Sequence, residues 1–389
     1  MRPDLLNRLR STAKAAVISL AILATVLLSV TNAWSQQKQD AKNKQTTKKP
    51  AARKKRQPEK KIDLVDSLKG TIQTGVRFRS VKGDRPGKFE ENRDFPKSVF
   101  VRSFLLNFES VDSPFFVDFK ALEFGERDER FSAEVGKVGT FRTEIMWDQI
   151  PKYYSTGRTF HLAAAPGLLV VNPDLRARLQ AVPDAGVAAS QLGPQLPNLV
   201  RQEVQNQASI NLRVRRDQFL LAQSYHPNKN WEFFVRAQNL RLSGTRPRTT
   251  GTFARDGVGP AGDGVWEDLG VELPEPIQYR TTNITLGVQY SRPKWRVGVD
   301  YNLSLFRNSI PSLTWENPFR VTDALAVRPA FSVGRNRFVR AQLALPPDND
   351  YQSISVHGSV DLPRTTQLRG AISWGKGTQN ERTILRISY

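Results

Sequence analysis

The amino-acid sequence predicts an all-β fold, an antiparallel transmembrane β-barrel with short periplasmic turns and long outer loops. Side chains alternate between apolar and polar over most of residues 62–389, and this period of two is typical of strands with one polar face. The alternating segments run about 9–12 residues, the length of a tilted membrane-spanning strand, whereas strands of soluble sheets average about 5–6. Very short connections alternate with very long ones. A large soluble β-sandwich shares the alternation and is the alternative interpretation.

Residues 1–35 have the layout of a cleaved secretory signal peptide. Four basic residues precede an uncharged, largely apolar stretch at 15–30, and Ala33-Trp34-Ser35 follows as a small-x-small cleavage pattern. An uncleaved membrane anchor is the alternative, but the apolar stretch is shorter than the ~20 residues of a spanning helix. The sequence therefore predicts an exported chain that resides in the bacterial outer membrane, in contact with its lipid.

Residues 36–61 form a strongly basic segment, with eleven basic and two acidic residues in a chain of net charge +21. The segment has no aromatic residue and no β-branched residue other than two threonines. It lacks the apolar surface needed to fold alone, so a disordered basic arm is predicted. The arm is either a solvated linker or a segment that docks electrostatically on an acidic protein or on anionic headgroups. No nucleic-acid partner is expected for an exported chain.

Residues 62–389 are predicted to form the barrel. The clearest alternating segments are 68–79, 139–148, 209–215, 282–291, 294–305, 351–361 and 366–375. Their apolar faces often carry an aromatic residue near one end, as interfacial girdles do: Trp147, Trp231, Tyr290, Trp295 and Trp374. Their polar faces suit a water-filled interior, and the candidate lumen-facing residues are Arg77, Arg142, Glu144, Arg213, Arg215 and Arg296.

The connections between these segments fall into two classes. Two are predicted to be tight turns, Pro293-Lys294 and Pro363-Arg364. Three are predicted to be long loops rich in Pro, Gly and Ala, at 149–206, 245–277 and 307–337. Pro173 to Val182, inside the first loop, is expected to form a short helix. The last residues, 383–389, alternate again and end on an aromatic residue, which resembles the terminal strand of bacterial outer-membrane barrels.

The residue types present exclude several kinds of chemistry. There is no cysteine, so thiolate metal sites, disulfides, cysteine nucleophiles and haem attachment through C-x-x-C-H are absent. The three histidines, His161, His226 and His357, lie far apart in the sequence. No nucleophile stands at a recognisable spacing from any of them. We therefore predict no enzymatic site, no metal site and no cofactor bound covalently to this chain.

Two blocks of the sequence resemble the MtrB/PioB family of outer-membrane barrels that associate with decahaem cytochromes. The first comprises 91–110 and 124–159, with W-D-Q-I-P at its most telling point, and the second comprises 340–381. The family-motif residues are Trp147, Asp148, Ile150 and Pro151. As a rim element they make physical sense: Trp147 is expected to anchor at headgroup level and Pro151, which cannot donate to a ladder, to stop the strand.

The resemblance implies a sheath or scaffold for a periplasmic multihaem c-type cytochrome, with electrons crossing the outer membrane along haems that belong only to that partner. Two other functions stay open at this point. A stand-alone porin would pass small solutes, anions included, along the arginines of the polar faces. An outer-membrane hydrolase would need a nucleophile that the sequence does not show.

Overall fold

The computed structural model describes residues 67–78, 80, 91–92, 98–110, 114–184, 189–251, 270–318 and 339–380. The predicted signal peptide at 1–35, the basic arm at 36–61 and the terminal strand at 383–389 lie outside these residues. Within them, no helix is both long enough and apolar enough to cross a membrane.

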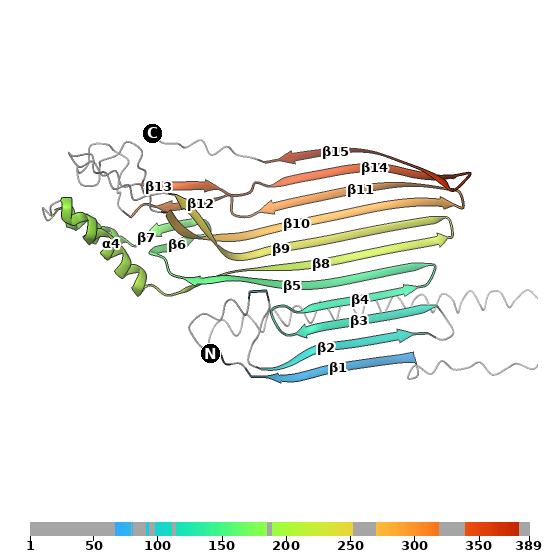
Figure 1. Ribbon diagram of the computed structural model, residues 1–389, viewed down its shortest axis with the longest axis horizontal. Coiled ribbons are helices and arrows are strands. Elements are labelled where there is room, and N and C mark those ends of the chain that lie inside the picture. Colours follow the sequence, from blue (N-terminus) through green and yellow to red (C-terminus); the bar gives the residue numbers. More distant parts are fainter. Residues whose placement is uncertain are drawn as a thin grey trace, which may run out of the picture. The chain divides into compact units, whose positions relative to one another are not determined.

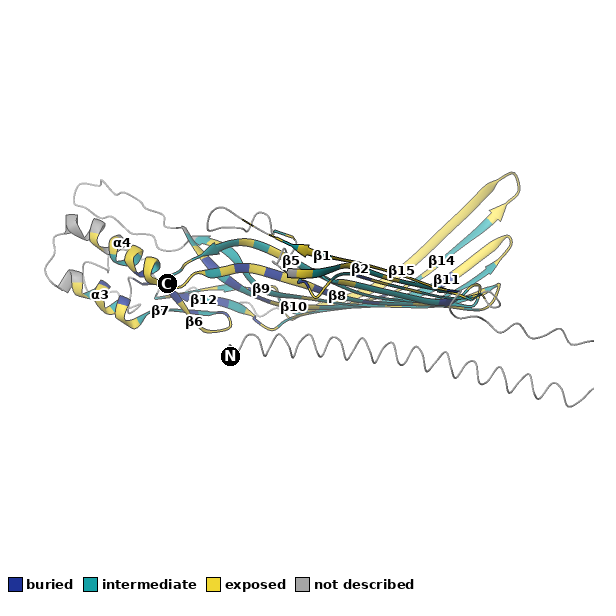
Figure 2. Ribbon diagram, turned by 90° about the horizontal axis from the view of Figure 1, so that it is seen from below, coloured by how far each residue is buried: buried dark blue, intermediate teal, exposed yellow. Residues whose placement is uncertain are grey.

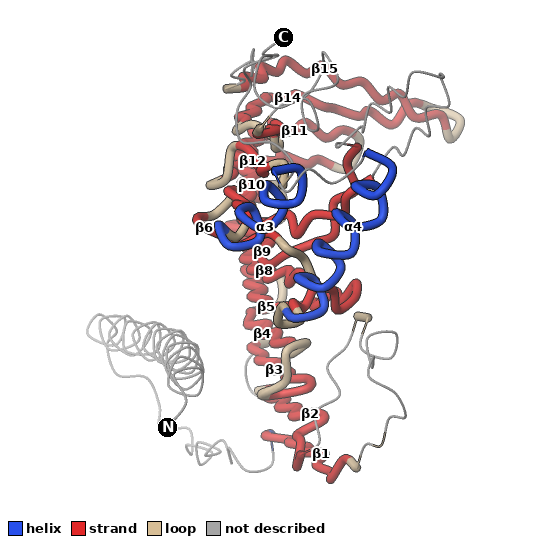
Figure 3. Tube along the Cα trace, turned by 90° about the vertical axis from the view of Figure 1, so that its left-hand side faces the viewer, coloured by secondary structure: helices blue, strands red, loops and turns tan. Residues whose placement is uncertain are grey.

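Most of the described residues belong to one antiparallel sheet of eleven strands, in which each strand pairs with its neighbour along the order β1-β2-β3-β4-β5-β8-β9-β10-β11-β14-β15 (Figure 1). The strands are β1 (Leu68–Arg77), β2 (Ser98–Glu109), β3 (Phe115–Phe124), β4 (Arg130–Lys137), β5 (Phe141–Gly157), β8 (Ile210–Asn228), β9 (Trp231–Gly251), β10 (Gly270–Arg292), β11 (Trp295–Asn308), β14 (Asn349–Leu362) and β15 (Thr366–Gln379). Figure 3 shows them following one another from β1 to β15. The predicted all-β antiparallel architecture is confirmed.

The two rims of this sheet differ as predicted. At one rim every connection is short: 110–114, 138–140, 229–230, 293–294 and 363–365. At the other rim the connections after β1, β5, β9 and β11 are long, and only 125–129 is short (Figure 1). Arg364 and Thr365 both have positive φ in the turn between β14 and β15, where the chain reverses within three residues. We call the two edges the short-turn rim and the long-loop rim; the long loops are the outer ones.

The central strands are longer than the predicted 9–12 residues, since β8, β9 and β10 have 19, 21 and 23 residues. Residues 245–251 and 270–277, which were predicted to lie in a loop, continue the ladder, with Gly251 opposite Gly270; residues 252–269 lie outside the described residues. Prolines do not interrupt it. Even-numbered residues of β10 direct their backbone groups toward β11, where Ser309 donates to Gln278. Because β11 ends before it could reach Pro274, that proline removes no ladder hydrogen bond.

The register separates the side chains into two continuous faces. On one face each strand contributes apolar residues, such as Ile145 on β5, Leu221 on β8, Ala237 on β9, Ile284 on β10 and Leu303 on β11, which pair in one row. Many side chains of this apolar face are exposed, Leu286 at 46% and Ile372 at 74% among them. Figure 2 shows the exposure extending along β14 and β15. Exposure of so much apolar surface in a single sheet is expected of a wall that contacts lipid.

A second, smaller unit of structure occupies the long-loop rim, and we call it the outer cap. Its four-stranded sheet has the order β13-β12-β7-β6, formed by β6 (His161–Ala165), β7 (Leu168–Val171), β12 (Ser312–Glu316) and β13 (Arg340–Ala344). The helices α3 (Pro173–Asp184) and α4 (Ala189–Asn206) complete it. The predicted short helix at 173–182 is confirmed as part of α3, whereas α4 was not predicted.

The outer cap has its own apolar core. Leu175 and Leu179 of α3 are fully buried against Leu313 and Trp315 of β12. Leu273 of β10 belongs to the same core, so the cap packs directly on the extended part of the large sheet. This contact explains why β10 continues beyond the length that a membrane requires.

Candidate functional site: the polar wall and the outer cap

The second face of the large sheet, which we call the polar wall, carries Arg142, Glu144 and Arg296. Arg142 pairs with Ser224 of β8 and Gly136 of β4, and Glu144 pairs with Ala222 and Glu134. Arg296 lies opposite Ser359 on β14 and Ser291 on β10. The register therefore places these three candidates on one face, as the alternation predicts. Ionisable and amide side chains on this face need an aqueous or protein neighbour, since lipid cannot solvate them.

Arg77 lies at the long-loop rim, where it is engaged by acidic residues. Its Nη1 donates to Glu126 Oε1 at 2.8 Å, and Nη2 lies 3.8 Å from Glu123 Oε2. Its guanidinium also lies 4.4 Å from the ring centroid of Phe100. Burial raises the pKa of Glu126 to about 6, against the lowering effect of Arg77, with Glu123 and Asp128 adding repulsion. The Arg77 guanidinium is therefore already paired with acidic residues of the long-loop rim.

The register separates Arg213 and Arg215 from Arg142. Arg215 lies opposite Pro151 and Ser243, and Arg213 opposite Tyr153. These are positions on the apolar side of the sheet, so the predicted grouping of these two arginines with Arg142 does not hold.

The reason is a reversal of polarity along β8. Within 219–225 the large apolar side chains Phe219, Leu221 and Tyr225 stand at odd positions with Leu220 as an exception, whereas near the cap the buried apolar side chains are the even ones, Leu212 and Val214. In the part of the sheet nearest the cap, the side that is apolar elsewhere carries exposed arginines, and the opposite side carries the buried side chains. The alternation of 209–215 is real, but its faces are exchanged relative to the rest of the barrel wall.

Complementary polar side chains pair across the strands of the polar wall. Arg142 Nε lies 2.8 Å from Glu134 Oε1, and His357 Nδ1 lies 3.2 Å from Asp300 Oδ2. Thr285 donates to Asn302 at 2.9 Å. Opposite charges and complementary polar groups across strands stabilise a sheet.

Side chains rise little above the backbone at several points of the polar wall, because aromatic rings lie across glycines. A Cβ at Gly287 would collide with the ring of Phe234, and one at Gly298 with His357. Three further glycines of the sheet are covered in the same way by a facing ring: Gly75 by Phe100, Gly136 by Phe116 and Gly375 by Tyr351. Rings that lie flat over glycine strengthen the pairing, and the glycines permit the wall to bend.

The W-D-Q-I-P segment does not end its strand as predicted, since β5 continues to Gly157. Gln149 donates to Glu129 at 3.0 Å, so odd positions of β5 direct their amides toward β4. Because β4 begins only at Arg130, opposite Asp148, Pro151 faces no strand on that side among the described residues, although Tyr153 N, two residues further on, donates to Glu91 O at 2.8 Å. A missing N–H costs nothing there.

The segment's four residues divide between the two faces. Trp147 pairs with Phe131 and Phe219 on the apolar face, and Pro151 shares that face. Asp148 pairs with Arg130 on the polar wall, and Ile150 is on the same side as Asp148.

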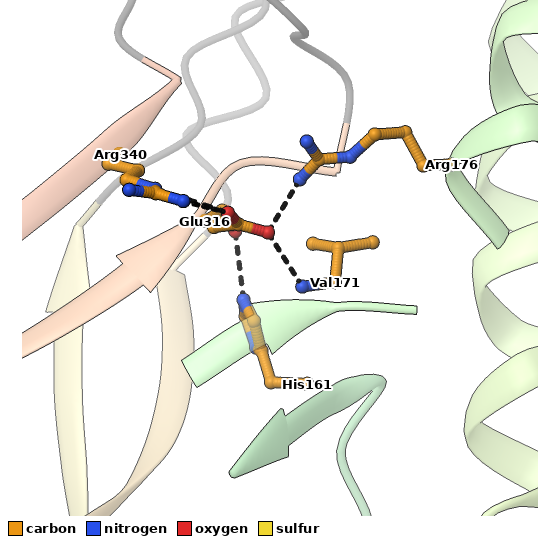
Figure 4. Close-up of polar contacts among 5 residues, drawn as sticks. All are labelled: His161, Val171, Arg176, Glu316 and Arg340. Atoms are coloured by element: carbon orange, nitrogen blue, oxygen red, sulfur yellow. Dashed lines mark hydrogen bonds and ion pairs between the residues drawn. The ribbon is translucent and has the colours of Figure 1, made fainter. Parts of the chain in front are cut away.

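A buried carboxylate, Glu316, holds the outer cap together (Figure 4). Its Oε2 accepts hydrogen bonds from Val171 N at 3.0 Å and from Arg176 Nη2 at 2.8 Å. Its Oε1 accepts from Arg340 Nε at 3.1 Å and Nη2 at 2.9 Å. His161 Nε2 contacts the Glu316 carbonyl at 2.9 Å. These contacts join β6, β7, β12, β13 and α3 at one carboxylate.

Electrostatics agree with a structural role for this cluster. Burial disfavours the Glu316 carboxylate, but the Val171 amide and the two arginines outweigh it and hold the pKa of Glu316 below its usual range. Burial lowers the pKa of His161, so that its imidazole is neutral at pH 7. This cluster was not predicted from the sequence, because Arg176, Glu316 and Arg340 come from three separate stretches of predicted loop or unassigned chain.

The part of the chain that the structure describes holds no group of three or more His, Asp or Glu side chains arranged for a metal ion. The three histidines lie apart: His161 in the cap, His226 on β8 near the short-turn rim and His357 on β14.

A wide antiparallel sheet with a lipid-suited face, a polar wall and unequal rims defines the wall of an outer-membrane β-barrel. Residues 82–386 match the family described as "Putative outer membrane beta-barrel porin, MtrB/PioB". The chain belongs to the MtrB/PioB family and is an outer-membrane protein, which confirms the resemblance found in the sequence.

One curated relative is the "Outer membrane protein MtrB" of Shewanella baltica (strain OS185), which is 22% identical over 265 residues. The match covers 68% of this chain and 32% of the relative. The chain therefore spans about a third of the length of the curated relative that it matches.

Among solved structures, the chain is similar to a loop-deletion mutant of the outer-membrane protein OmpT of Vibrio cholerae, at a TM-score of 0.31 and 8% identity, covering 80% of this chain and 72% of that one. It is also similar to the toluene transporter TbuX of Ralstonia pickettii, at a TM-score of 0.22 and 8% identity, covering 80% and 67%. Values this low transfer neither topology nor function, so the family assignment rests on the sequence.

Proposed function

We propose that this chain forms the wall of a barrel that encloses a multihaem c-type cytochrome and insulates it from the outer membrane. In this role the chain is not an enzyme and carries no haem. Electrons cross along the haems of the partner, while the barrel supplies a lipid-facing exterior and a polar interior. Family membership supports the proposal, and the observation that carries it is the character of the polar wall.

A sheath needs an inner surface that a second protein can approach closely. The flat aromatic rings over Gly287, Gly298 and Gly375 reduce the height of side chains on the wall. The side-chain pairs Arg142–Glu134 and His357–Asp300 satisfy polar groups of the wall within the sheet and so limit the desolvation that contact would cost. A wall lined instead with rows of unpaired arginines would be better suited to small anions than to a protein surface.

The direction of β1 bears on the side from which the predicted basic arm would act. Leu68 begins β1 at the short-turn rim, because the first long connection follows the other end of that strand (Figure 1). With this rim on the periplasmic side, we infer that the segment 36–61, which precedes β1 in the sequence, acts from the periplasm. From this side it would attract an acidic periplasmic protein, with an effect that salt screens.

Co-purification with haem staining tests the sheath. The full chain is extracted from the native host in mild detergent, captured through an affinity tag and examined for covalently bound haem in the eluate. We expect a haem-staining partner with the wild-type chain. Ser355→Trp, which adds bulk to the polar wall, should reduce the amount retained. Val356→Trp, which places the same side chain on the apolar face, should not reduce the amount retained. Absence of any haem protein with the wild-type chain would refute the sheath.

A porin is the second candidate, and one observation favours it. The polar wall contains an open hollow of about 710 Å³ near the long-loop rim, with Arg102, Lys120 and Arg130 in its lining beside the carboxylates of Glu123, Asp128 and Asp148. A small anion that enters the hollow would meet these three cations. The purified chain alone in a planar bilayer distinguishes the two functions. Steady, anion-selective conductance that Lys120→Gln weakens supports the porin, whereas a sheath without its partner predicts no such selectivity.

A further inference from the structure

Three arginines form a row on the apolar side of the large sheet, close to the long-loop rim. Arg241 of β9 lies directly opposite Arg280 of β10, and Arg280 lies directly opposite Arg307 of β11. All three side chains are exposed. Neighbouring strands are about 4.8 Å apart, so the row extends roughly 10 Å across the sheet.

The height of the row along the strands places it at a membrane boundary. At the short-turn rim the same face carries Trp231, Tyr290 and Trp295, whose rings contact one another with centroids 4.7 and 5.3 Å apart. Ten residues separate Tyr290 from Arg280. At about 3.4 Å per residue this is roughly 34 Å along the strand, and a tilt of ~40° leaves ~26 Å across the membrane. That is the height of the apolar band of an outer-membrane barrel, about 25 Å.

The residues between these two levels are suited to hydrocarbon. On β10 they are Val288, Leu286, Ile284 and Thr282, and each pairs across the ladder on the same face. The arginine row therefore begins where the apolar band ends. Since the long loops are the outer ones, this is the level of the outer-leaflet headgroups.

The row is electrostatically unfavourable by itself. Like charges directly opposite on adjacent strands destabilise a sheet. Arg307 is offset by an ion pair with Asp350. Asp217, opposite Arg241, is engaged by Arg215, whose Nε lies 2.7 Å from its Oδ1. No carboxylate among the described residues forms an ion pair with Arg241 or Arg280, so their charges call for an external anion.

We propose that Arg241 and Arg280, with Arg307 at the edge of the row, bind the phosphate of an outer-leaflet lipid headgroup. Guanidinium groups donate two parallel hydrogen bonds to phosphate oxygens, and the acyl chains of such a lipid would lie along Leu286 and Ile284 below. The row thereby fixes the depth of the wall in the membrane. This inference rests on the outer-membrane location of the chain and not on what occupies the barrel.

Binding of a fluorescent lipid A analogue to the purified full chain in detergent micelles, measured by anisotropy, tests the proposal. Arg241→Gln with Arg280→Gln should weaken binding by about tenfold or more, because both charge-assisted contacts are lost. The matched control, Arg236→Gln with Arg369→Gln, removes the same charge from the polar wall and should change binding less than about twofold. Arg241→Lys with Arg280→Lys should retain part of the affinity, because charge remains but the planar fork is lost.

Two results would overturn the proposal. One is equal weakening by the two glutamine pairs, which would mean that net charge alone attracts the lipid. The other is displacement by inorganic phosphate as effective as by unlabelled lipid A, which would identify a general anion site. Circular dichroism of each variant checks folding, and if the double variant does not fold, each single substitution, Arg241→Gln or Arg280→Gln, is measured and should weaken binding on its own.

Discussion

Arginine at Leu286 should destabilise the chain strongly if the apolar face contacts lipid. Leu286 is 46% exposed and pairs with Val235 and Tyr301 on that face. It lies four residues from Tyr290 and six from Arg280, near the middle of the apolar band. An arginine at the bilayer midplane on the lipid face of a barrel costs about 2–4 kcal/mol. We therefore expect Leu286→Arg to lower the free energy of unfolding by roughly that amount.

Asn283→Arg provides the matched control on the polar wall. Asn283 lies three residues from Leu286 and donates to Gln238 at 3.2 Å, so its loss costs about 1 kcal/mol at most. Leu286→Ala separates lost packing from inserted charge and should cost less than the arginine. Denaturant unfolding of chains folded into lipid vesicles, followed by tryptophan fluorescence, gives all three values. Equal costs for the two arginine substitutions would refute the assignment of the faces.

Three further predictions address the cap, the wall and the exported segment. Glu316→Gln should lower the free energy of local opening of the outer cap by roughly 2–4 kcal/mol, since two guanidinium groups lose their carboxylate; hydrogen exchange measures it. Because folding lowers the pKa of Glu316, the contribution of this carboxylate to the stability of the cap is present at neutral pH and should be lost as the pH falls below the usual range of a glutamate. Hydrogen-exchange protection of the cap that is independent of pH would contradict this. Gly287→Ala should destabilise the sheet by about 1–3 kcal/mol against the ring of Phe234, whereas Gly370→Ala, with open space around it, should be nearly neutral in the same denaturation assay. N-terminal sequencing should show the mature chain beginning near Gln36. Deletion of 36–61 should slow association with the haem partner more at low salt than at ~0.15 M. An association rate that does not respond to salt would contradict electrostatic docking.

The sequence was sufficient for the parts of the fold that follow from local pattern. Period-two alternation predicted the strands of the wall, and the tight turns at 293–294 and 363–365 were confirmed. Leu286 and Val297 share one face of the sheet, as the alternation within 282–291 and 294–305 predicts. These features depend on side chains only a few positions apart, which a sequence displays directly.

Other features depend on neighbours that the sequence does not display. Alternation at 209–215 predicted two faces but could not say which side of the sheet each would occupy, so Arg213 and Arg215 were grouped with the wrong neighbours. The proline at 151 led to the prediction that the strand ends there, and this was wrong. Only the register shows that β4 does not extend along that part of β5, so that a proline is tolerated. Glu316 gathers partners up to 155 residues away, and no spacing rule identifies such a cluster.

Site-specific photo-crosslinking shows whether a multihaem cytochrome lies against the polar wall. A benzophenone amino acid is placed at Ser355 on the polar wall or at its neighbour Val356 on the apolar face. Cells of the native host are then irradiated, and crosslinked products are stained for haem. If the wall encloses a cytochrome, we expect a haem-staining product that contains this chain from position 355 and none from position 356. A haem-staining product from 356 alone, or from neither position, would contradict it.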